Sequence, residues 1–132
     1  MKIYLDENLP SKLAEGLNIL EAPNHEGFEV LPMIKDFGKG AKDQDWIPVI
    51  GPQGGVVITQ DLNINRNRQL KQLYLDNGLG IFFFSPPKKG YKYWDMVEQI
   101  IKRWRELKTL SRATRRPFTY RCTSYSKRFE RM

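Results

Sequence analysis

The chain has 132 residues, 40% of them hydrophobic, which is enough to bury one core but too few for two. No stretch approaches the roughly 18 to 20 apolar residues of a membrane span, and the N-terminus lacks the pattern of a signal peptide, so we expect a single cytoplasmic domain without membrane contact. The single cysteine, Cys122, excludes a disulfide framework, and with one histidine, His25, a zinc site is not expected, so oxygen atoms must hold any metal.

The positive charge of the chain is concentrated in its last quarter. The formal net charge is +7, yet residues 100–132 contain eleven Lys or Arg and only two acidic residues, so the remainder is slightly negative. A basic segment joined to an acid-bearing body is typical of proteins that bind nucleic acid, because neutralised phosphates release counterions. The alternative is a solvated basic surface that only keeps the protein soluble.

The first predicted strand and helix follow directly from apolar spacing. Residues 2–5 are apolar and β-prone, and they stop at the acidic pair Asp6 and Glu7, where a buried strand cannot continue. Leucines then recur at spacings of three and four, which predicts a helix over residues 11–21. The first strand therefore ends at the acidic residues.

A second strand and a short helix are expected next. Residues 28–33 predict the strand, and residues 37–40, which contain two glycines, predict a flexible loop. The short helix begins near Asp43, which is placed to cap it or to lie in its first turn, and ends near residues 51–52.

The run at residues 56–59 is the clearest buried strand in the chain. It is β-branched without alternation, as expected where helices cover both faces of a parallel sheet. It too is followed by an acidic residue, Asp61. A helix over residues 67–76, which Gly78 is placed to terminate, comes after a polar loop.

The remaining pattern completes an alternating order of strands and helices. Residues 81–84 predict a fourth strand, residues 93–110 one long helix, and residues 117–123 an edge strand before a loose basic tail. Trp94 and Trp104 lie about 80° apart on that helix, so we expect one in the core and the other at a homodimer or partner interface. The order predicts an α/β fold with a mostly parallel sheet.

Acidic residues follow two of the predicted strands. Ligands bind beyond the carboxyl ends of parallel strands, so Asp6 and Asp61 are expected at one edge of the sheet, with Asp43 entering from the start of a helix. Clustered carboxylates repel one another and are stabilised by a hard divalent ion such as Mg²⁺ or Mn²⁺. Such an ion activates water for hydrolysis of a phosphodiester. The alternative is that these acidic residues only cap helices or end strands. In that interpretation Glu7 points away from the sheet edge and Asp45 is a solvated residue of the first helical turn.

Three segments together resemble a known family. They are Leu5-Asp6-Glu7-Asn8-Leu9-Pro10, Lys42-Asp43-Gln44-Asp45-Trp46-Ile47-Pro48 and Val56-Val57-Ile58-Thr59-Gln60-Asp61. In this order and spacing they are similar to the PIN-like domains related to VapC-type toxins, and the similarity continues to Arg115-Arg116-Pro117-Phe118.

The resemblance implies a PIN-like three-layer α/β/α sandwich. Residues 1–116 would form the nuclease domain, and residues 117–132 would add a basic C-terminal strand and tail to the same domain. It also implies a metal-dependent ribonuclease, in many relatives a toxin paired with an antitoxin. Asp6, Asp43 and Asp61 would bind Mg²⁺ or Mn²⁺, with Glu7 and Asp45 as weaker candidates. Gln69 stands where the family has a fourth acid, which puts full activity in doubt.

The candidate contacts to RNA are basic residues of the polar loop and of the C-terminal part, namely Arg66, Arg68, Arg112, Arg115, Arg116 and Arg121. A catalytically weak or inactive module that binds RNA or a protein partner would use the same residues, and metal-dependent cleavage separates the two functions. A phospho-acceptor signalling domain is a third interpretation, but Lys88 follows Ser85 too closely for the lysine that such a site needs.

Overall fold

Short apolar runs of the chain pair into one six-stranded sheet in the computed structural model, which describes residues 1–132. The strands are β1 (Lys2–Leu5), β2 (Glu29–Pro32), β3 (Val56–Thr59), β4 (Gly80–Phe84), β5 (Phe118–Cys122) and β6 (Glu130–Arg131). Their order is β2-β1-β3-β4-β5-β6, and all neighbours are parallel except β5 and β6. The predicted α/β class with a mostly parallel sheet is confirmed.

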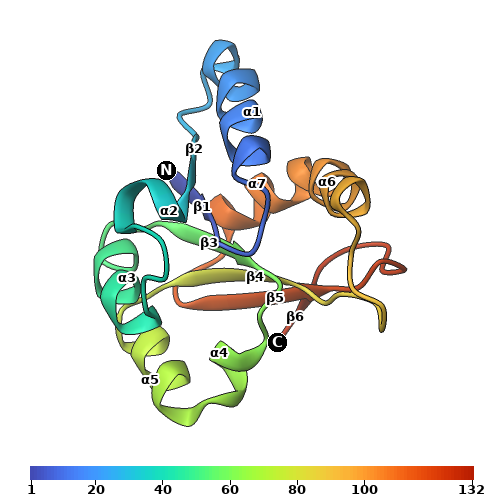
Figure 1. Ribbon diagram of the computed structural model, residues 1–132. Coiled ribbons are helices and arrows are strands. Elements are labelled where there is room, and N and C mark those ends of the chain that lie inside the picture. The colour runs from blue at the N-terminus through green and yellow to red at the C-terminus, as the bar shows by residue number, and fades with distance from the viewer.

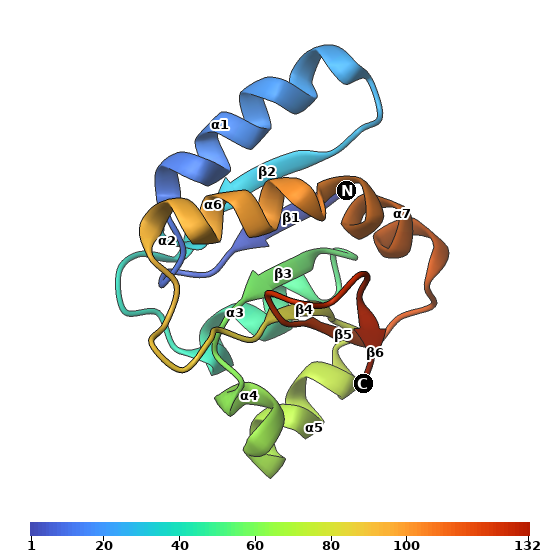
Figure 2. The same ribbon diagram turned by 90° about the vertical axis from the view of Figure 1, so that its right-hand side faces the viewer.

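Helices cover both faces of this sheet. They are α1 (Ser11–Glu21), the 3-10 turn η1 (Ala22–Asn24), α2 (Met33–Phe37), α3 (Asp43–Ile50), α4 (Asn63–Arg66), α5 (Arg68–Asp76), α6 (Tyr93–Lys102) and α7 (Trp104–Ala113). In Figures 1 and 2, α1, α6 and α7 lie on one face, and α2, α3 and α5 on the other. The result is the predicted α/β/α sandwich. None of these helices combines the length and the apolar character that crossing a membrane would require.

Alternate residues of the strands pack into different layers, as the pleat of a strand requires. In β4, Phe82 and Phe84 join the apolar cluster beneath α1, α6 and α7, whereas Ile81 and Phe83 join the cluster beneath α3 and α5. A strand buried on both faces has no polar side, which explains the unbroken apolar run in the sequence. Trp46 and Cys122 are both buried.

The expected single helix over residues 93–110 is wrong, because the structure divides it into α6 and α7 at Arg103. The backbone of Arg103 leaves helical geometry, with φ −101° and ψ 4°. Its buried guanidinium Nη2 donates hydrogen bonds to the carbonyl oxygens of Thr123 and Ser126, at 2.9 and 2.8 Å. The helix is therefore broken where a side chain anchors the loop between β5 and β6.

The loose tail expected after the fifth strand is also wrong. Residues 130–131 form β6, which pairs with β5, so β6 and not β5 lies at the edge of the sheet. The Phe129 ring packs against the rings of Phe82 and Phe84, with centroid distances of 4.9 and 5.6 Å, and holds the C-terminal segment against the sheet. Similarly, Phe37, which was expected in a loop, ends α2. Both segments are ordered by contacts with distant parts of the chain.

The break between α6 and α7 also separates the two tryptophans. Trp104, the first residue of α7, is 8% exposed and belongs to the apolar core, whereas Trp94 is 70% exposed on α6. We expect Trp104→Ala to lower the free energy of unfolding by about 3 to 5 kcal/mol and Trp94→Ala to change it by less than about 0.5 kcal/mol. Urea unfolding followed by circular dichroism measures both values. Equal losses for the two variants would contradict this placement.

Candidate functional site

Parallel pairing places Asp6 and Asp61 at the same edge of the sheet. In the register of β1 and β3, Leu5 lies opposite Ile58, and the ladder continues one residue further because the Asp6 backbone nitrogen donates to the Ile58 oxygen at 3.0 Å. Asp61 comes two residues after β3 ends at Thr59. Residues far apart in the chain thus meet beyond the carboxyl ends of neighbouring strands.

Thr59 joins these two acidic residues. Its hydroxyl donates to Asp6 Oδ2 at 2.7 Å and accepts a hydrogen bond from the Asp61 backbone nitrogen at 3.0 Å. Asp61 Oδ1 in turn accepts from the Asn63 backbone nitrogen at 2.9 Å, which fixes the carboxylate at the start of the next loop. Thr59 is a residue of the site that the sequence patterns did not identify. The feature that could have indicated its role is a hydroxyl group at the end of a strand that is otherwise aliphatic.

Asp43 reaches the same place from the first turn of α3. Burial raises the pKa of Asp43 above its ordinary value, and the charges of Asp6 and Asp61 raise it further. Burial also raises the pKa of Asp6, although hydrogen bonds from Thr59 and the Glu7 backbone oppose the shift, and the charge of Asp61 adds to it. The three carboxylates are therefore close enough to repel one another.

The two weaker metal candidates have other partners. Glu7 is exposed, and its two carboxylate oxygens accept hydrogen bonds from the Gly40 backbone nitrogen at 3.1 and 2.9 Å. Asp45 accepts from the Lys42 backbone nitrogen at 3.2 Å at the start of α3. Both residues therefore secure the segment that carries Asp43, rather than lying free toward the other carboxylates.

The chemistry of the donors fits a hard cation, because they are carboxylate oxygens whose mutual repulsion a positive ion would relieve. Their present arrangement does not complete a site, since no three His, Cys, Asp or Glu side chains are grouped so that they could hold a metal ion.

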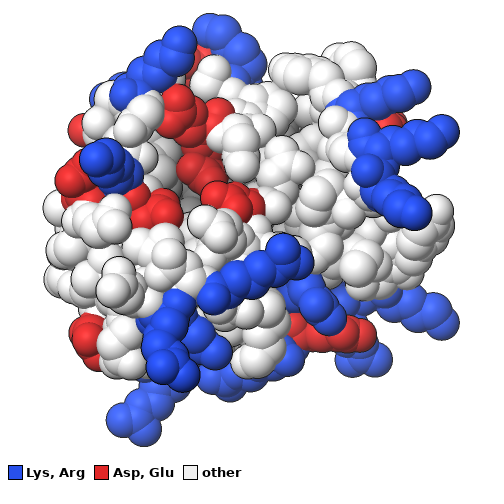
Figure 3. Space-filling model, turned by 60° about the horizontal axis from the view of Figure 1, so that its bottom comes forward, with Lys and Arg blue, Asp and Glu red and all other residues white.

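Acidic side chains gather on one face of the molecule, and Lys and Arg side chains lie around them (Figure 3). Arg66 and Arg68, in α4 and at the start of α5, follow the carboxyl end of β3 and are exposed. Arg121, also exposed, lies on β5 opposite Glu130. Of the arginines predicted to contact RNA, these three lie near the carboxyl end of a strand.

The other predicted arginines lie toward the opposite edge of the sheet. Arg116 Nη1 donates to the oxygen of Gly55, the residue before β3, at 2.6 Å. Arg112 donates to the Glu26 backbone oxygen, and its guanidinium carbon lies 4.2 Å from the centre of the Phe28 ring. Arg115 is exposed between α7 and β5. The structure therefore does not bring these three arginines together with the acidic residues.

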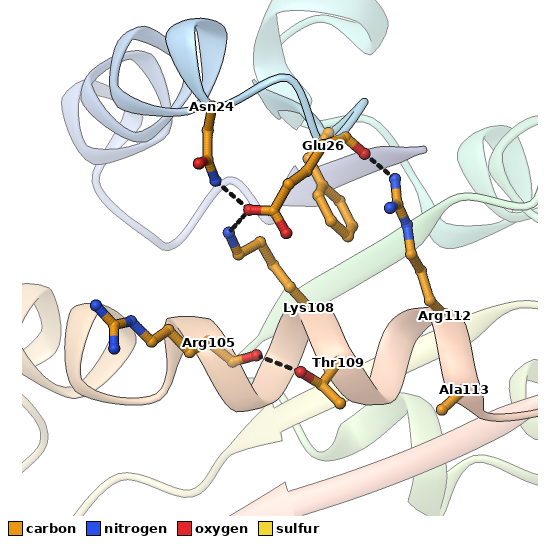
Figure 4. Close-up of a pocket in the computed structure, with 8 residues that line it drawn as sticks. Asn24, Glu26, Arg105, Lys108, Thr109, Arg112 and Ala113 are labelled. Carbon is orange, nitrogen blue, oxygen red and sulfur yellow. Dashed lines mark hydrogen bonds and ion pairs between the residues drawn. The ribbon is translucent and has the colours of Figure 1, made fainter.

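The largest cavity, about 630 Å³, also lies away from the acidic residues, between α7 and the segment before β2 (Figure 4). Two of its three basic side chains already have partners, and the third, Arg105, is exposed. Lys108 Nζ lies 2.8 Å from both Glu21 Oε1 and Glu26 Oε1, and Arg112 is engaged as described. These interactions attach α7 to the end of α1, so this cavity is not the candidate site.

Comparison with known proteins identifies one family. A family model described as PIN like domain matches residues 1–86, which contain β1 to β4 and the acidic residues Asp6, Asp43 and Asp61. No curated protein and no solved structure matches the chain.

The role of Thr59 can be tested by removing its hydroxyl while keeping its shape. Thr59→Val leaves the Asp61 nitrogen and one Asp6 oxygen without a partner, so we expect the free energy of unfolding to fall by about 1 to 3 kcal/mol. Urea unfolding provides the measurement. Thr119→Val in β5 is the matched control, expected to change stability by less than about 0.5 kcal/mol. A Thr59→Val protein as stable as the wild type would show that this hydroxyl does not hold the two acidic residues.

Proposed function

The chain belongs to the PIN-like domain family, whose members are generally nucleases, and we propose that it is a metal-dependent endoribonuclease acting through Asp6, Asp43 and Asp61. One observation carries the proposal. Three carboxylates from separate segments are brought to one edge of the sheet, where burial first and neighbouring negative charge second raise the pKa values of Asp6 and Asp43. Such an arrangement costs stability, which a purely structural role would not require.

The residues of the chain orient the site in this mechanism. Thr59 holds one oxygen of Asp6, and the Asn63 nitrogen holds one oxygen of Asp61, so each carboxylate keeps a fixed direction. Asp43 closes the cluster from α3. Mg²⁺ or Mn²⁺ bound by these oxygens would lower the pKa of water and stabilise negative charge on the phosphate.

A second candidate function is a weak or inactive PIN-like module that binds RNA or a protein. The observation that favours it is the lack of three carboxylates already grouped to hold a metal. Gln69, at the start of α5, supplies no fourth carboxylate. Cleavage that depends on metal separates this candidate from the ribonuclease.

The Asp61→Asn variant tests the ribonuclease. Asparagine keeps the oxygen that accepts from Asn63, so the fold should be retained and the repulsion on Asp6 and Asp43 reduced. We expect cleavage of RNA with Mg²⁺ or Mn²⁺ to fall by about 100-fold or more, because a metal ligand is lost. Gel analysis of labelled RNA measures it.

The matched control is Asp76→Asn, the same chemical change at the exposed end of α5, which should leave cleavage unchanged. EDTA should abolish the wild-type cleavage. Activity that survives both EDTA and Asp61→Asn would remove the metal mechanism.

The proposal extends to a toxin of the VapC type with a cognate antitoxin, which rests on the resemblance of the three acidic segments. A partner would find an apolar groove of about 250 Å³ between α1 and α6, where Leu20 and Trp94 are each 70% exposed. We place the antitoxin there. If light scattering shows that the purified chain is a dimer, the groove belongs to a second copy instead.

Growth of a bacterial host tests the toxin. Induced expression of the wild-type chain should arrest growth, because uncontrolled cleavage of RNA stops protein synthesis, and Asp61→Asn at equal expression should not. Optical density of the cultures measures the difference. Normal growth with the active, folded wild-type protein would exclude a toxin while leaving the ribonuclease intact.

A further inference from the structure

A basic and aromatic loop follows the carboxyl end of β4 at the same edge as the acidic residues. Between β4 and α6 the chain reads Ser85-Pro86-Pro87-Lys88-Lys89-Gly90-Tyr91-Lys92, and Tyr93 begins α6. Figure 2 shows this loop on the same side of the molecule as the turn between β1 and α1. The three lysines are exposed and form no ion pair. They are therefore free to contact an anionic ligand.

This loop forms one wall of a cleft that opens beside the acidic cluster. The cleft has a volume of about 300 Å³. One wall carries Tyr91, Lys92 and Tyr93, and the other carries Asn8 and Gln60. Asn8 lies two residues after Asp6, and Gln60 directly precedes Asp61, so the cleft is lined by the segments that carry two of the carboxylates.

Both walls of the cleft are held in place. Gln60 Nε2 donates to the Asn8 backbone oxygen at 3.2 Å, which ties the two chain segments of the acidic wall together. On the other wall, the Tyr91 hydroxyl donates to the Ser85 backbone oxygen at 3.2 Å and fixes the half-buried ring. The neighbouring Tyr93 ring is about half exposed. The cleft is therefore lined by the fixed ring of Tyr91, the more exposed ring of Tyr93 and the cation of Lys92 on one wall, and by the amides of Asn8 and Gln60 on the other.

This combination suits a nucleotide of a single strand. Aromatic rings stack on bases, lysines contact the phosphates on either side, and amides bond to base edges. A volume at the lower end of ligand pockets accommodates one unit of a polymer. In a duplex the faces of the bases are covered by their neighbours, so the rings of this cleft could not reach them.

We propose that this cleft, lined by Asn8, Gln60, Tyr91, Lys92 and Tyr93, holds an unpaired base of a single-stranded RNA whose phosphodiester lies over Asp6, Asp43 and Asp61. This assignment rests on the proposed ribonuclease function. Lys88 and Lys89 extend the phosphate contacts beyond the cleft. The strand therefore approaches the site across the loop between β4 and α6, and not across the arginines at the opposite edge.

Binding measured without cleavage tests the assignment. Fluorescence anisotropy with a labelled single-stranded RNA oligonucleotide in EDTA reports affinity while metal-dependent hydrolysis is blocked. Tyr93→Leu should weaken binding by about 5- to 100-fold without changing its salt dependence, because stacking is lost and charge is not. Tyr125→Leu is the matched control, since this tyrosine is 91% exposed in the loop between β5 and β6, does not line the cleft and should leave binding unchanged.

Charge is tested separately. Replacing Lys88, Lys89 and Lys92 together by alanine should reduce the slope of log affinity against log salt by up to about 2, at roughly 0.7 per phosphate of a single strand. The control removes three exposed cations from the other side of the molecule, Lys2, Arg105 and Arg115, and should leave the slope nearly unchanged. Equal effects of the two triple variants would overturn the placement of the strand.

The outcomes also separate this inference from the ribonuclease proposal. If the wild type cleaves RNA but Tyr93→Leu and the triple lysine variant bind as tightly as the wild type, the cleft assignment is wrong and the ribonuclease stands. If the wild type never cleaves RNA but both variants lose binding, the cleft is supported and the ribonuclease is wrong. A duplex of the same sequence should bind more weakly than the single strand, and equal affinity would contradict base stacking. Circular dichroism confirms that each variant is folded.

Discussion

The parallel pairing of β1 with β3 is the constraint on which the candidate site depends. A parallel ladder aligns the carboxyl ends of its strands, and here it continues to the hydrogen bond from Asp6 to Ile58. Asp6 and Asp61 consequently meet, with Thr59 between them. The neighbouring parallel strands deliver the loop before α3 and the lysine-rich loop after β4 to the same edge. One pattern of pairing therefore assembles both the acidic cluster and the cleft beside it.

The stability of the molecule comes from elsewhere than this edge. Two apolar clusters, one on each face of the sheet, bury the strands and hold the helices against them. The acidic cluster works against folding, since burial and neighbouring charge raise the pKa values of Asp6 and Asp43. Local hydrogen bonds from Thr59, Asn63 and the Glu7 backbone nitrogen offset part of this cost without neutralising the carboxylates. Substitutions at the cluster are thus able to change function without unfolding the protein.

Some basic residues of the C-terminal part have partners inside the fold, and others are exposed. Burial alone would raise the pKa of Glu21, but hydrogen bonds from Lys108 and Trp104 outweigh it and hold the pKa below its ordinary value. Lys108 therefore serves as a buried anchor between α1 and α7, and Arg103 anchors the loop between β5 and β6. A high count of cations in a segment does not by itself locate a surface for RNA, because several of these side chains are used inside the fold.

The amino-acid sequence alone determined the elements whose signals are local. The spacing of leucines defined α1 and the unbroken β-branched run defined β3. Acidic residues after two strands and at the start of a helix pointed to Asp6, Asp61 and Asp43, because such patterns need only neighbouring residues to be read. The tertiary structure alone decided the break at Arg103, the folding back of Phe129, the bridge made by Thr59 and the edge on which each basic residue lies. Each of these depends on contacts between segments distant in the chain, and such contacts exist only after the strands have paired.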